Sequence, residues 1–534
     1  MRRALGDFDY IVIGAGSAGC VLANRLSASG RARVLLLEAG PSDLNPWIHV
    51  PLGYAKLFRD PSVNWLYETE PQPELDGRRI PQPRGKVLGG SSSINALIYI
   101  RGQREDFDGW RQSGAVGWGY EDVLPYFRRS QHQMRGEDAF HAVGGPLPVS
   151  NQATHRLCDA FIDASEQAGF PRNPDFNGAA QEGAGYFQTT SRAGRRASAA
   201  VAYLNPAKRR PNLVIITRAQ VTRVVVEGGR ATGVEWRHDA MDFRAGARAE
   251  VVLSAGAIGT PQILQLSGIG PGALLAEHGV PVVHDLPGVG ENLQDHLQVR
   301  MVFRATGPIT LNDDLRGWWG KARAGIAYAL ARKGPLTVGA GYAGGFFRTD
   351  AKVASPDIQV HFLTFSTDRM GDQLHDFSGF TASSCQLRPE SRGTVRITSP
   401  DPFAYPAIDP RYFTAEADRR ANVEGLKLLR RIMAAPAFAS LVAEEVEPGP
   451  GAADDETLLA YCRARATTIY HPTCTARMGD DPMAVTDWRL KVRGIEGLRI
   501  SDGSIMPRVV SGNTNAACIM IGEKAADLIL EDAK

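Results

Sequence analysis

The sequence lacks the features of a secreted, membrane-spanning or nucleic-acid-binding protein. Its 534 residues carry a formal net charge of +2, without the basic excess that nucleic-acid binding requires. Six cysteines are scattered without C-x-x-C spacing, which argues against a disulfide framework and favours a reducing compartment. No apolar run reaches the ~18 residues that a membrane-spanning helix needs. We therefore expect a cytoplasmic protein with no transmembrane segment; peripheral contact with a membrane stays open.

Other signals that would assign a different class are also missing. Asp7 and Asp9 interrupt the apolar residues that follow the basic N-terminus, so we expect no targeting segment. The chain has no G-x-S-x-G elbow of the kind that serine hydrolases carry. The pair His471 and Cys474 has no second ligand pair at zinc-like spacing, and we expect no metal.

The first informative stretch is a glycine loop near the N-terminus. Tyr10–Ile13 is a short continuous apolar run, as in a strand buried on both faces. Gly14, Gly16 and Gly19 then form a G-x-G-x-x-G loop, and Ser17–Ser27 has a helical pattern. The glycines permit a tight turn, backbone approach to a pyrophosphate and close packing of helix on strand. This pattern predicts a dinucleotide site at the helix N-terminus.

A second strand completes this unit. Val34–Leu37 is apolar and ends at Glu38, a carboxylate placed to accept hydrogen bonds from ribose hydroxyls. The alternative is a glycine-rich turn in an unrelated α/β protein, which the strand, helix, strand and acid in series disfavour. The fingerprint alone does not separate FAD from NAD.

A serine-rich segment follows a long irregular stretch, 41–83. It reads Arg-Gly-Lys-Val-Leu-Gly-Gly-Ser-Ser-Ser-Ile-Asn over residues 84–95. Its glycines and serines offer N–H groups and hydroxyls for phosphates or a flat polar ring. A Ser-rich N-cap over an ordinary buried helix explains the same residues equally well.

Five motifs, taken in order, resemble those of the glucose-methanol-choline (GMC) oxidoreductases. They are the opening fingerprint, the serine-rich segment, 256–271, the Tyr470-His471-Pro472 stretch and 511–515. The resemblance runs from about Phe8 to Ile529. It implies an α/β FAD-binding Rossmann-like domain with a discontinuous parallel sheet, and an α+β substrate-binding domain with an antiparallel sheet. It also implies FAD as cofactor and an alcohol as substrate.

The length of the chain and the resemblance together predict two domains and their boundaries. A chain of 534 residues is too long for one compact core. We assign 1–155, 195–305 and 465–534 to the FAD-binding domain, and 156–194 and 306–464 to the substrate-binding domain. A helix over 311–334 and antiparallel strands at 358–362, 383–387 and 393–397 are expected in the latter.

The resemblance also implies a set of cofactor-binding residues. They are Gly14, Gly16, Ser17, Ala18, Glu38, Ala39, Val87, Gly90, Asn95, Ala96, Leu97, Val221, Asp502, Gly503, Asn515 and Ala516. Tyr342 and Tyr470 are expected in the substrate pocket. For Val221 the implied contact runs through the backbone, and a plain β-strand residue is the alternative.

His471 is the predicted general base. It precedes a proline, which biases the backbone away from helix, and it matches the catalytic histidine of the family. Without the resemblance, a core histidine bonded to a carbonyl would be the better interpretation. Asn515 matches the second pocket residue of the family; an amide orients a substrate oxygen but takes no proton. His296, in a neighbouring motif, is interpreted as structural.

Two departures from the family pattern narrow the prediction. Ile94 occupies the position where some relatives attach FAD through a histidine, so non-covalent FAD is expected. Tyr342 stands where choline-specific relatives carry a glutamate, which disfavours choline and favours an uncharged primary alcohol.

The resulting hypothesis is an FAD-dependent alcohol dehydrogenase. It oxidises a primary alcohol to the aldehyde by hydride transfer to flavin N5, and its electrons pass to a quinone or dye-like acceptor. Alternatives are an oxygen-using alcohol oxidase of the same family and a non-redox, FAD-containing hydroxynitrile lyase. A flavoprotein acting only in binding or electron transfer and an NAD-dependent dehydrogenase are less favoured.

Overall fold

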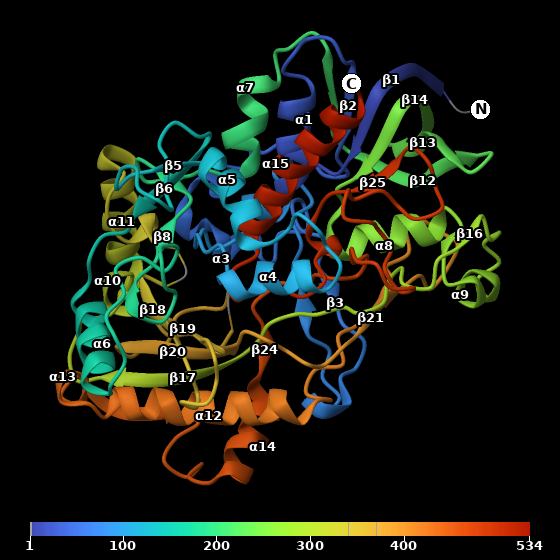
Figure 1. Cartoon of the computed structure of the whole chain (residues 1–534). Helices are drawn as coiled ribbons and strands as arrows, with labels where there is room; N and C mark the ends of the chain where they lie inside the picture. Colours follow the sequence, from blue (N-terminus) through green and yellow to red (C-terminus); the bar gives the residue numbers. More distant parts are fainter. Residues whose placement is uncertain (1–2, 340, 370) are drawn as a thin grey trace.

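Two large sheets organise the chain. A computed structural model describes residues 3–339, 341–369 and 371–534. Figure 1 shows the two sheets at opposite ends of the molecule, with both chain termini near the first. The expected combination of a Rossmann-like parallel sheet and an antiparallel sheet is confirmed.

The first sheet is built from segments far apart in the sequence. Its parallel strands are β11 (Leu213–Ile216), β2 (Val34–Leu37), β1 (Arg3–Ile13), β14 (Met241–Leu253) and β25 (Leu498–Ile500). Two antiparallel strands, β13 (Arg230–His238) and β12 (Ala219–Glu227), extend it. The end of β1 and all of β2 are buried, as their continuous apolar sequences predict.

Helices α1 (Ser17–Leu26) and α15 (Asn515–Asp532) pack against each other beside this sheet, as Figure 1 shows. Their contact is close because Gly522 faces α1, where an added Cβ would lie 2.9 Å from the Cα of Ala18. Arg25 of α1 also donates two hydrogen bonds, of 2.7 and 2.9 Å, to the buried carboxylate of Glu523. A glycine and a buried ion pair therefore set how the last helix meets the first.

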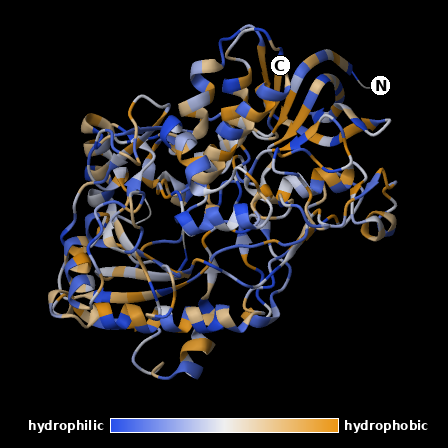
Figure 2. Ribbon diagram, in the orientation of Figure 1, coloured by the Kyte–Doolittle hydropathy of each residue, from blue (hydrophilic) through white to orange (hydrophobic). Residues whose placement is uncertain are grey.

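The second sheet is antiparallel. Its order is β23 (Val442–Glu447), β17 (Leu297–Ala305), β20 (Gly379–Gln386), β19 (Ile358–Leu363), β18 (Ala343–Phe347) and β7 (Gly183–Tyr186), with β24 (Thr467–Thr468) beside β17. Helix α12 (Glu416–Met433) packs along it, and the hydropathy colours of Figure 2 alternate along this helix as for a half-buried element.

The second sheet includes two strands that the sequence prediction assigns to the other domain. β17 lies in this sheet, although the sequence assigns 195–305 to the FAD-binding domain, and β24 lies there although 465–534 has the same assignment. The expected strand at 393–397 forms as β21 (Thr394–Arg396), but it pairs with β22 (Ala407–Asp409) outside the large sheet. The domain division itself stays a prediction.

The helix predicted over 311–334 is broken in two. α10 (Leu311–Asp314) ends after one turn and α11 (Gly317–Ala331) begins afresh. The break falls where Arg316 is extended and Gly317 has a φ of +63°, a conformation that continues no right-handed helix.

Shorter elements connect the two sheets. The helices are α2 (Pro46–His49), α3 (Tyr54–Leu57), α4 (Arg104–Gln112), α5 (Tyr120–Ser130), α6 (Arg156–Gln167), α7 (Asn205–Ala207), α8 (Gly256–Leu266), α9 (Gly272–Glu277), α13 (Pro436–Ala439) and α14 (Asp455–Arg465). The strands are β3 (Tyr67–Glu68), β4 (Pro81–Gln82), β5 (Gln131–Gln133), β6 (Leu147–Asn151), β8 (Gln188–Thr189), β9 (Ser191–Arg192), β10 (Arg195–Arg196), β15 (Ile269–Gly270) and β16 (His284–Asp285).

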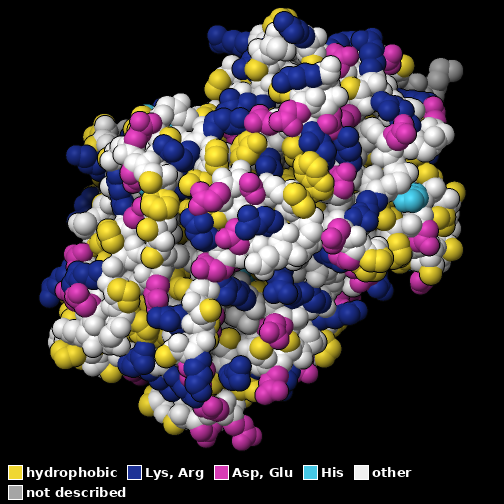
Figure 3. Space-filling view, in the orientation of Figure 1, with side chains coloured by type: hydrophobic (Ala, Val, Ile, Leu, Met, Phe, Trp, Pro, Cys, Tyr) yellow, Lys and Arg dark blue, Asp and Glu magenta, His cyan; other side chains and the backbone are white. Residues whose placement is uncertain are grey.

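The surface is mixed in charge. On the face shown in Figure 3, basic and acidic side chains are interspersed, in keeping with the small net charge. Among the helices of the described residues, none has the length and apolar character needed to cross a bilayer.

The close approach of α1 to the first sheet leads to a stability prediction. A Cβ at Gly19 would lie 1.9 Å from the carbonyl oxygen of Gly14, a backbone atom that cannot move aside. Gly19→Ala should therefore lower the free energy of unfolding by at least about 2 kcal/mol, measured by denaturant titration.

Gly109→Ala is the matched control. Gly109 lies within α4, and a Cβ added to it would have no other atom within 4 Å, so this alanine should stabilise the helix by about 0.5–1 kcal/mol. Equal effects of the two substitutions would contradict the packing argument.

Candidate active site

A long cavity lies between the two sheets. Its walls come from the loop after β1, the serine-rich segment, the strands β17, β19 and β20, and the C-terminal segments 469–473, 502–503 and 513–515. Residues of every motif singled out in the sequence thus meet around one space, which runs from the nucleotide-binding loop to the second sheet.

The glycine loop forms one wall because no side chain fits there. Gly14 has a φ of +96°, and a Cβ on it would lie 2.5 Å from the carbonyl oxygen of Ser254. A Cβ on Gly90 would lie 2.7 Å from the Cα of Gly16, so the serine-rich segment packs on the loop. Backbone N–H groups and the N-terminus of α1 therefore face the cavity, the arrangement that binds a pyrophosphate.

Glu38 stands at the end of β2 beside this loop. Its carboxylate accepts hydrogen bonds from the N–H groups of Ala15 (2.8 Å) and Gly40 (2.9 Å). Burial raises the pKa of Glu38 to about 7, and these two N–H groups act in the opposite direction. The carboxylate lines the cavity at the position expected for a ribose contact.

Asp502 holds the turn after β25. It accepts hydrogen bonds from the Gly256 N–H (2.8 Å) and the Thr260 hydroxyl (2.6 Å), which join the last strand to the start of α8. Its own turn is closed by the Ser504 N–H at 2.8 Å. Asp502 and Gly503 both line the cavity at the carboxyl end of the parallel sheet, where open α/β sheets bind ligands.

Most predicted cofactor residues line this one cavity. They are Gly14, Gly16, Ser17, Ala18, Glu38, Ala39, Gly90, Asn95, Ala96, Leu97, Val221, Asp502, Gly503 and Asn515. Val87 and Ala516 are instead buried in apolar clusters behind the wall.

Of the two tyrosines predicted to lie in the substrate pocket, the structure places one at the cavity and the other away from it. Tyr470 lines the cavity, with its ring 5.1 Å from that of Phe58. Tyr342 does not: it packs against the core of the second sheet and stacks on His155 at 5.8 Å. It lies just before β18, and its side chain joins the apolar cluster that holds Ala343 and Phe347. The expectation for Tyr342 is corrected on this geometry.

His471 reaches the cavity from a strained turn. Tyr470 has a φ of +71°, and the N–H of His471 donates to the buried carboxylate of Asp295 at 2.8 Å. Arg84 donates to the carbonyl oxygen of Tyr470. The imidazole is 8% exposed and lines the cavity.

A chain of hydrogen bonds orients this imidazole. His471 Nδ1 lies 3.0 Å from His296 Nδ1, and His296 Nε2 lies 3.0 Å from the carbonyl oxygen of Leu387. On the other side, the amide nitrogen of Asn513 lies 3.3 Å from His471 Nε2. Gln359 donates to the amide oxygen of Asn513 at 3.2 Å, which fixes how that amide is turned.

Asn515 occupies a different place from the one expected. Its side-chain oxygen accepts a 2.7 Å hydrogen bond from the Ser17 hydroxyl, which joins the first turns of α15 and α1. The amide beside His471 belongs to Asn513, two residues earlier in the same motif. Helix α15 starts at Asn515, so the two asparagines diverge: Asn513 precedes the helix and faces His471.

Burial controls the protonation of His471. Desolvation holds its pKa well below the ordinary histidine value, and repulsion of the protonated ring by the charge of Arg84 adds to this effect. The ring is therefore neutral at physiological pH and able to accept a proton. Burial raises the pKa of the Cys474 thiol to about 12, and its Sγ lies 3.2 Å from the Thr473 hydroxyl.

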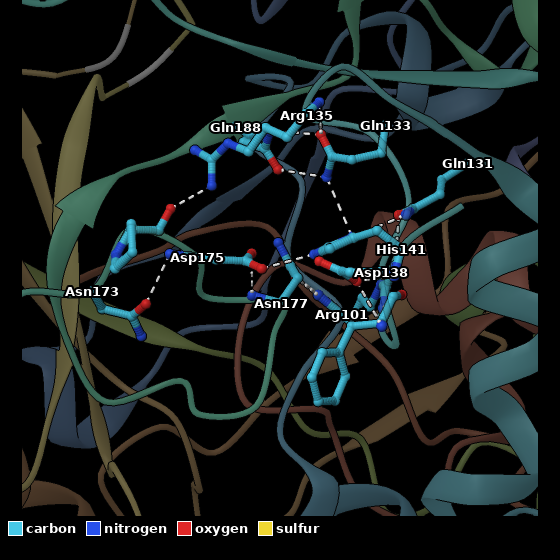
Figure 4. A network of polar contacts seen from close by, with 12 residues as sticks. Arg101, Gln131, Gln133, Arg135, Asp138, His141, Asn173, Asp175, Asn177 and Gln188 are labelled. Carbon is cyan, nitrogen blue, oxygen red and sulfur yellow. Dashed lines mark hydrogen bonds and ion pairs between the residues drawn. The ribbon is translucent and has the colours of Figure 1, made fainter. Parts of the chain in front are cut away.

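A second histidine cluster lies away from the cavity and is drawn in Figure 4. His141 Nε2 lies 2.7 Å from Asp175, and His141 Nδ1 lies 2.9 Å from the amide nitrogen of Gln131. Asp138 accepts from the backbone N–H groups of Phe140 and His141. Protein groups lie within hydrogen-bond distance of both ring nitrogens, and one possible ligand atom from each of Asp138, His141 and Asp175 lies within 4.8 Å of the others.

Several cavity residues escape prediction from the sequence. They are Tyr54, Phe58, Arg84, Gln298, Arg300, His361, Ser383 and Asn513. Asn513 lies inside one of the five motifs, which is the signal that could have found it. Arg84 opens the serine-rich segment, so its motif was also a signal. Tyr54 and Phe58 lie at the two ends of the short helix α3. The remaining residues lie on strands of the second sheet, and which of them face the cavity becomes known only when the sheet is paired. His296, interpreted as structural, is in contact with the predicted base.

Comparison with known proteins identifies the family. The GMC oxidoreductase model for the N-terminal part matches residues 8–298, and the model for the C-terminal part matches 389–522. The chain belongs to the GMC oxidoreductase family.

Two curated GMC relatives span nearly the same length. An alcohol dehydrogenase [acceptor] of Pseudomonas putida is 44% identical over 98% of this chain and 96% of its own length. An oxygen-dependent choline dehydrogenase of Vibrio vulnificus (strain YJ016) is 44% identical, covering 98% of this chain and 94% of the relative.

Solved GMC structures share the fold over nearly the whole chain. The pyridoxine 4-oxidase from Mesorbium loti superposes with a TM-score of 0.89 at 31% identity, over 97% of this chain and 98% of its own. A formate oxidase structure gives a TM-score of 0.91 at 27% identity, over 99% of both chains.

FAD is the cofactor of this GMC chain, and the cavity fits it. The glycine loop carries no side chain that would block a pyrophosphate, Glu38 lines the cavity where a ribose contact is expected, and the same cavity includes Asp502 and His471. Ile94 lines the cavity with a hydrocarbon side chain, which offers no nucleophile for a covalent bond to the flavin.

Non-covalent attachment has a direct test. Acid precipitation of the purified holoprotein should release all the yellow colour into the supernatant, measured by its absorbance against the total flavin. Colour retained in the washed pellet would contradict the assignment made from Ile94.

Proposed function

We propose that this protein oxidises a primary alcohol to the aldehyde, with His471 as the general base. The observation that carries the proposal is the hydrogen-bond chain behind His471, which leaves the lone pair of its Nε2 at the cavity, beside the amide of Asn513. FAD, when bound, supplies the hydride acceptor. The protein has to bind the alcohol, orient it and remove its hydroxyl proton.

The direction of each hydrogen bond follows from the carbonyl at the end of the chain. A carbonyl oxygen only accepts, so His296 donates to Leu387 from Nε2. A neutral His296 then has a lone pair on Nδ1, and His471 must donate to it from its own Nδ1. The proton of neutral His471 is therefore on Nδ1, and Nε2 carries the lone pair. His296 acts as a positioning residue that selects this tautomer.

Asn513 completes the site from the other side. Since Gln359 donates to its amide oxygen, its NH₂ group points to His471 Nε2, the atom where the alcohol proton arrives. An amide N–H at this point can hold the substrate oxygen next to the base without competing for the proton. We assign to Asn513 the positioning role that the sequence assigned to Asn515.

For the electron acceptor we propose a quinone or a dye-like carrier, with molecular oxygen as the alternative. One relative is named for an unspecified acceptor and another for oxygen. Mixing the alcohol-reduced enzyme with each acceptor in a stopped-flow instrument separates the two. A hydroxynitrile lyase would leave the flavin oxidised when an alcohol is added without oxygen. We place the protein in the cytoplasm.

The role of the base is tested by its removal. His471→Ala should slow anaerobic flavin reduction by about 10²–10⁴-fold, because it removes the proton acceptor. FAD should stay bound, since the glycine loop is untouched. A fully loaded His471→Ala protein that reduces at close to the wild-type rate would refute the proposal.

The two asparagines provide an internal comparison. Asn513→Ala should slow flavin reduction by about 10-fold or more, whereas Asn515→Ala should act mainly on FAD affinity through the lost Ser17 bond. The reverse ranking in reduction rate would restore the role expected for Asn515.

The pH dependence follows from the lowered pKa of His471. The neutral ring is the active form, and a lowered pKa extends its presence to lower pH. The rate constant of flavin reduction should therefore stay level from pH 8 down to about 6, through the ordinary histidine range. A rate that halves near pH 6.5 would show a base with an unshifted pKa.

A further inference from the structure

The end of the cavity beyond His471 is built on the second sheet and carries a positive charge. Arg300 of β17 lies opposite Ser383 of β20, which lies opposite His361 of β19. All three side chains line the cavity. The sheet therefore presents a row of an arginine, a hydroxyl and an imidazole.

Within the part of the chain that the structure describes, no carboxylate forms an ion pair with this arginine. Among the described residues, none forms an ion pair or hydrogen bond with the guanidinium of Arg300. The acids that line the cavity, Glu38 and Asp502, lie in the FAD-binding part and are bonded to backbone N–H groups there. Arg84, the other cavity guanidinium, donates to the carbonyl oxygens of Pro83 and Tyr470.

A second group near Arg300 also lacks a partner. The hydroxyl of Tyr54 is fully buried, lines the cavity and has no hydrogen-bond partner among the described residues. Arg300 is close enough for its charge to act on the pKa values of Tyr54, Tyr470 and His361. Burial and nearby charge lower the pKa of His361 to about 4, so this histidine is neutral and adds no charge. A buried hydroxyl and a free guanidinium are the donors that a carboxylate requires.

We propose that Arg300 and Tyr54 bind a carboxylate of the substrate, so that the preferred alcohol is a hydroxycarboxylate. This inference rests on the proposed alcohol oxidation and replaces the expectation of an uncharged alcohol. Arg300 donates to the carboxylate from its planar guanidinium and Tyr54 from its hydroxyl. The alcohol end then lies at His471, and the rings of Phe58 and Tyr470 flank the body between them. A quaternary ammonium at Arg300 would be repelled.

Matched substrates test the proposal. 4-(Hydroxymethyl)benzoate and 6-hydroxyhexanoate are each compared with the isosteric primary amide, by kcat/KM from anaerobic flavin reduction. Each carboxylate should exceed its amide by at least about 10-fold. Arg300→Gln should lower kcat/KM for the carboxylates by about 100-fold and leave the amides within about threefold, and Arg300→Lys should restore part of the loss. Equal values for acid and amide in both pairs would overturn the proposal.

Arg304→Gln is the control on the same strand. Arg304 is exposed and pairs with Glu444, so this substitution should leave both substrate classes unchanged. Binding of 4-methylbenzoate, followed by the flavin spectrum, covers the case in which no alcohol is oxidised. If the wild-type protein binds 4-methylbenzoate and Arg300→Gln abolishes this binding, the anion site is supported although the proposed oxidation has failed. If no alcohol is oxidised and the wild-type protein does not bind 4-methylbenzoate, both the oxidation and the anion site are overturned.

A separate observation concerns the outer face of α11. Trp318, Trp319, Ile326 and Leu330 are 65%, 71%, 60% and 84% exposed. The spacings along this helix are eight residues from Trp318 to Ile326 and four from Ile326 to Leu330. These side chains therefore form one stripe along the helix, with Trp319 beside it. The buried residues Ala324 and Tyr328 lie two positions from Ile326, on the opposite side. The stripe is therefore an exposed apolar face.

The basic residues around this face indicate what kind of surface binds to it. Lys321 and Arg323 flank the stripe, and Arg332 and Lys333 follow the helix. Arg323 lies 3.7 Å from Asp314 and remains exposed, and Arg332 stacks on Tyr328. Bulky apolar side chains with two aromatic rings are exposed here beside long basic ones, whose apolar stems and charged ends suit the interface of an anionic bilayer.

We infer that α11 binds the surface of an anionic bilayer. The helix also adjoins the cavity wall: the hydroxyl of Tyr328 lies 3.1 Å from the carbonyl oxygen of Gly194 and 3.4 Å from the carbonyl oxygen of His49, in the segment leading to Tyr54. Docking there would bring the substrate-side wall near the membrane, where apolar acceptors dissolve.

Sedimentation with vesicles tests this inference. The holoenzyme should bind vesicles of phosphatidylcholine with about 30% phosphatidylglycerol, more weakly at high salt. Trp318→Ser with Trp319→Ser should lower the partition coefficient at least about 10-fold, whereas Trp488→Ser, at another exposed tryptophan, should not. Wild-type protein that stays in the supernatant, or a dimer in solution that only the double variant abolishes, would overturn it.

Discussion

The structure depends on a place where backbone meets backbone with no room for a side chain. Gly14 lies against Ser254, Gly19 against Gly14, and Gly90 against Gly16. These contacts bring β1, β14, α1 and the serine-rich segment to one point. Any Cβ there would separate them, and the wall of the cavity formed by N–H groups would be lost. The lack of space for side chains therefore leaves backbone N–H groups at the cavity, where they can bind a phosphate.

The reacting end depends on the polarity of one hydrogen-bond chain. A carbonyl oxygen closes the chain behind His296, and Gln359 closes it beyond Asn513. With both ends set, a single arrangement of protons satisfies every neutral group between them. Gln359 comes from the second sheet and Leu387 follows its strand β20, whereas His471 and Asn513 come from the C-terminal segments. The base is therefore oriented only when the two parts of the molecule are assembled.

The cavity differs in chemistry from end to end. Around Gly14 and Glu38 it presents N–H groups and one acid, which suits a nucleotide. Around Arg300 it presents a guanidinium and an unbonded tyrosine hydroxyl. Outside, α11 carries exposed tryptophans beside the same wall. The guanidinium and the hydroxyl lack a hydrogen-bond partner within the described protein, and a ligand is the partner that the proposal assigns to them.

The sequence by itself determined the nucleotide-binding unit. An apolar run, three glycines, a helical pattern and a terminal acid are local signals, and each follows from the conformation of a few consecutive residues. The same holds for His471, whose motif is continuous. The resemblance of five ordered motifs extended this to the fold and to FAD.

Only the tertiary structure decided which polar residues face one another. Asn513 and Asn515 are two residues apart in one motif, but α15 begins at Asn515. Asn513, before the helix, lies beside His471, whereas Asn515, in its first turn, accepts a hydrogen bond from Ser17. Tyr342 packs in the core of the second sheet instead of the cavity. Arg300 lines the cavity together with Ser383 and His361, because the pairing of strands decides which side chains share a face. Such relations join residues far apart in the chain, and spacing along a sequence does not encode them.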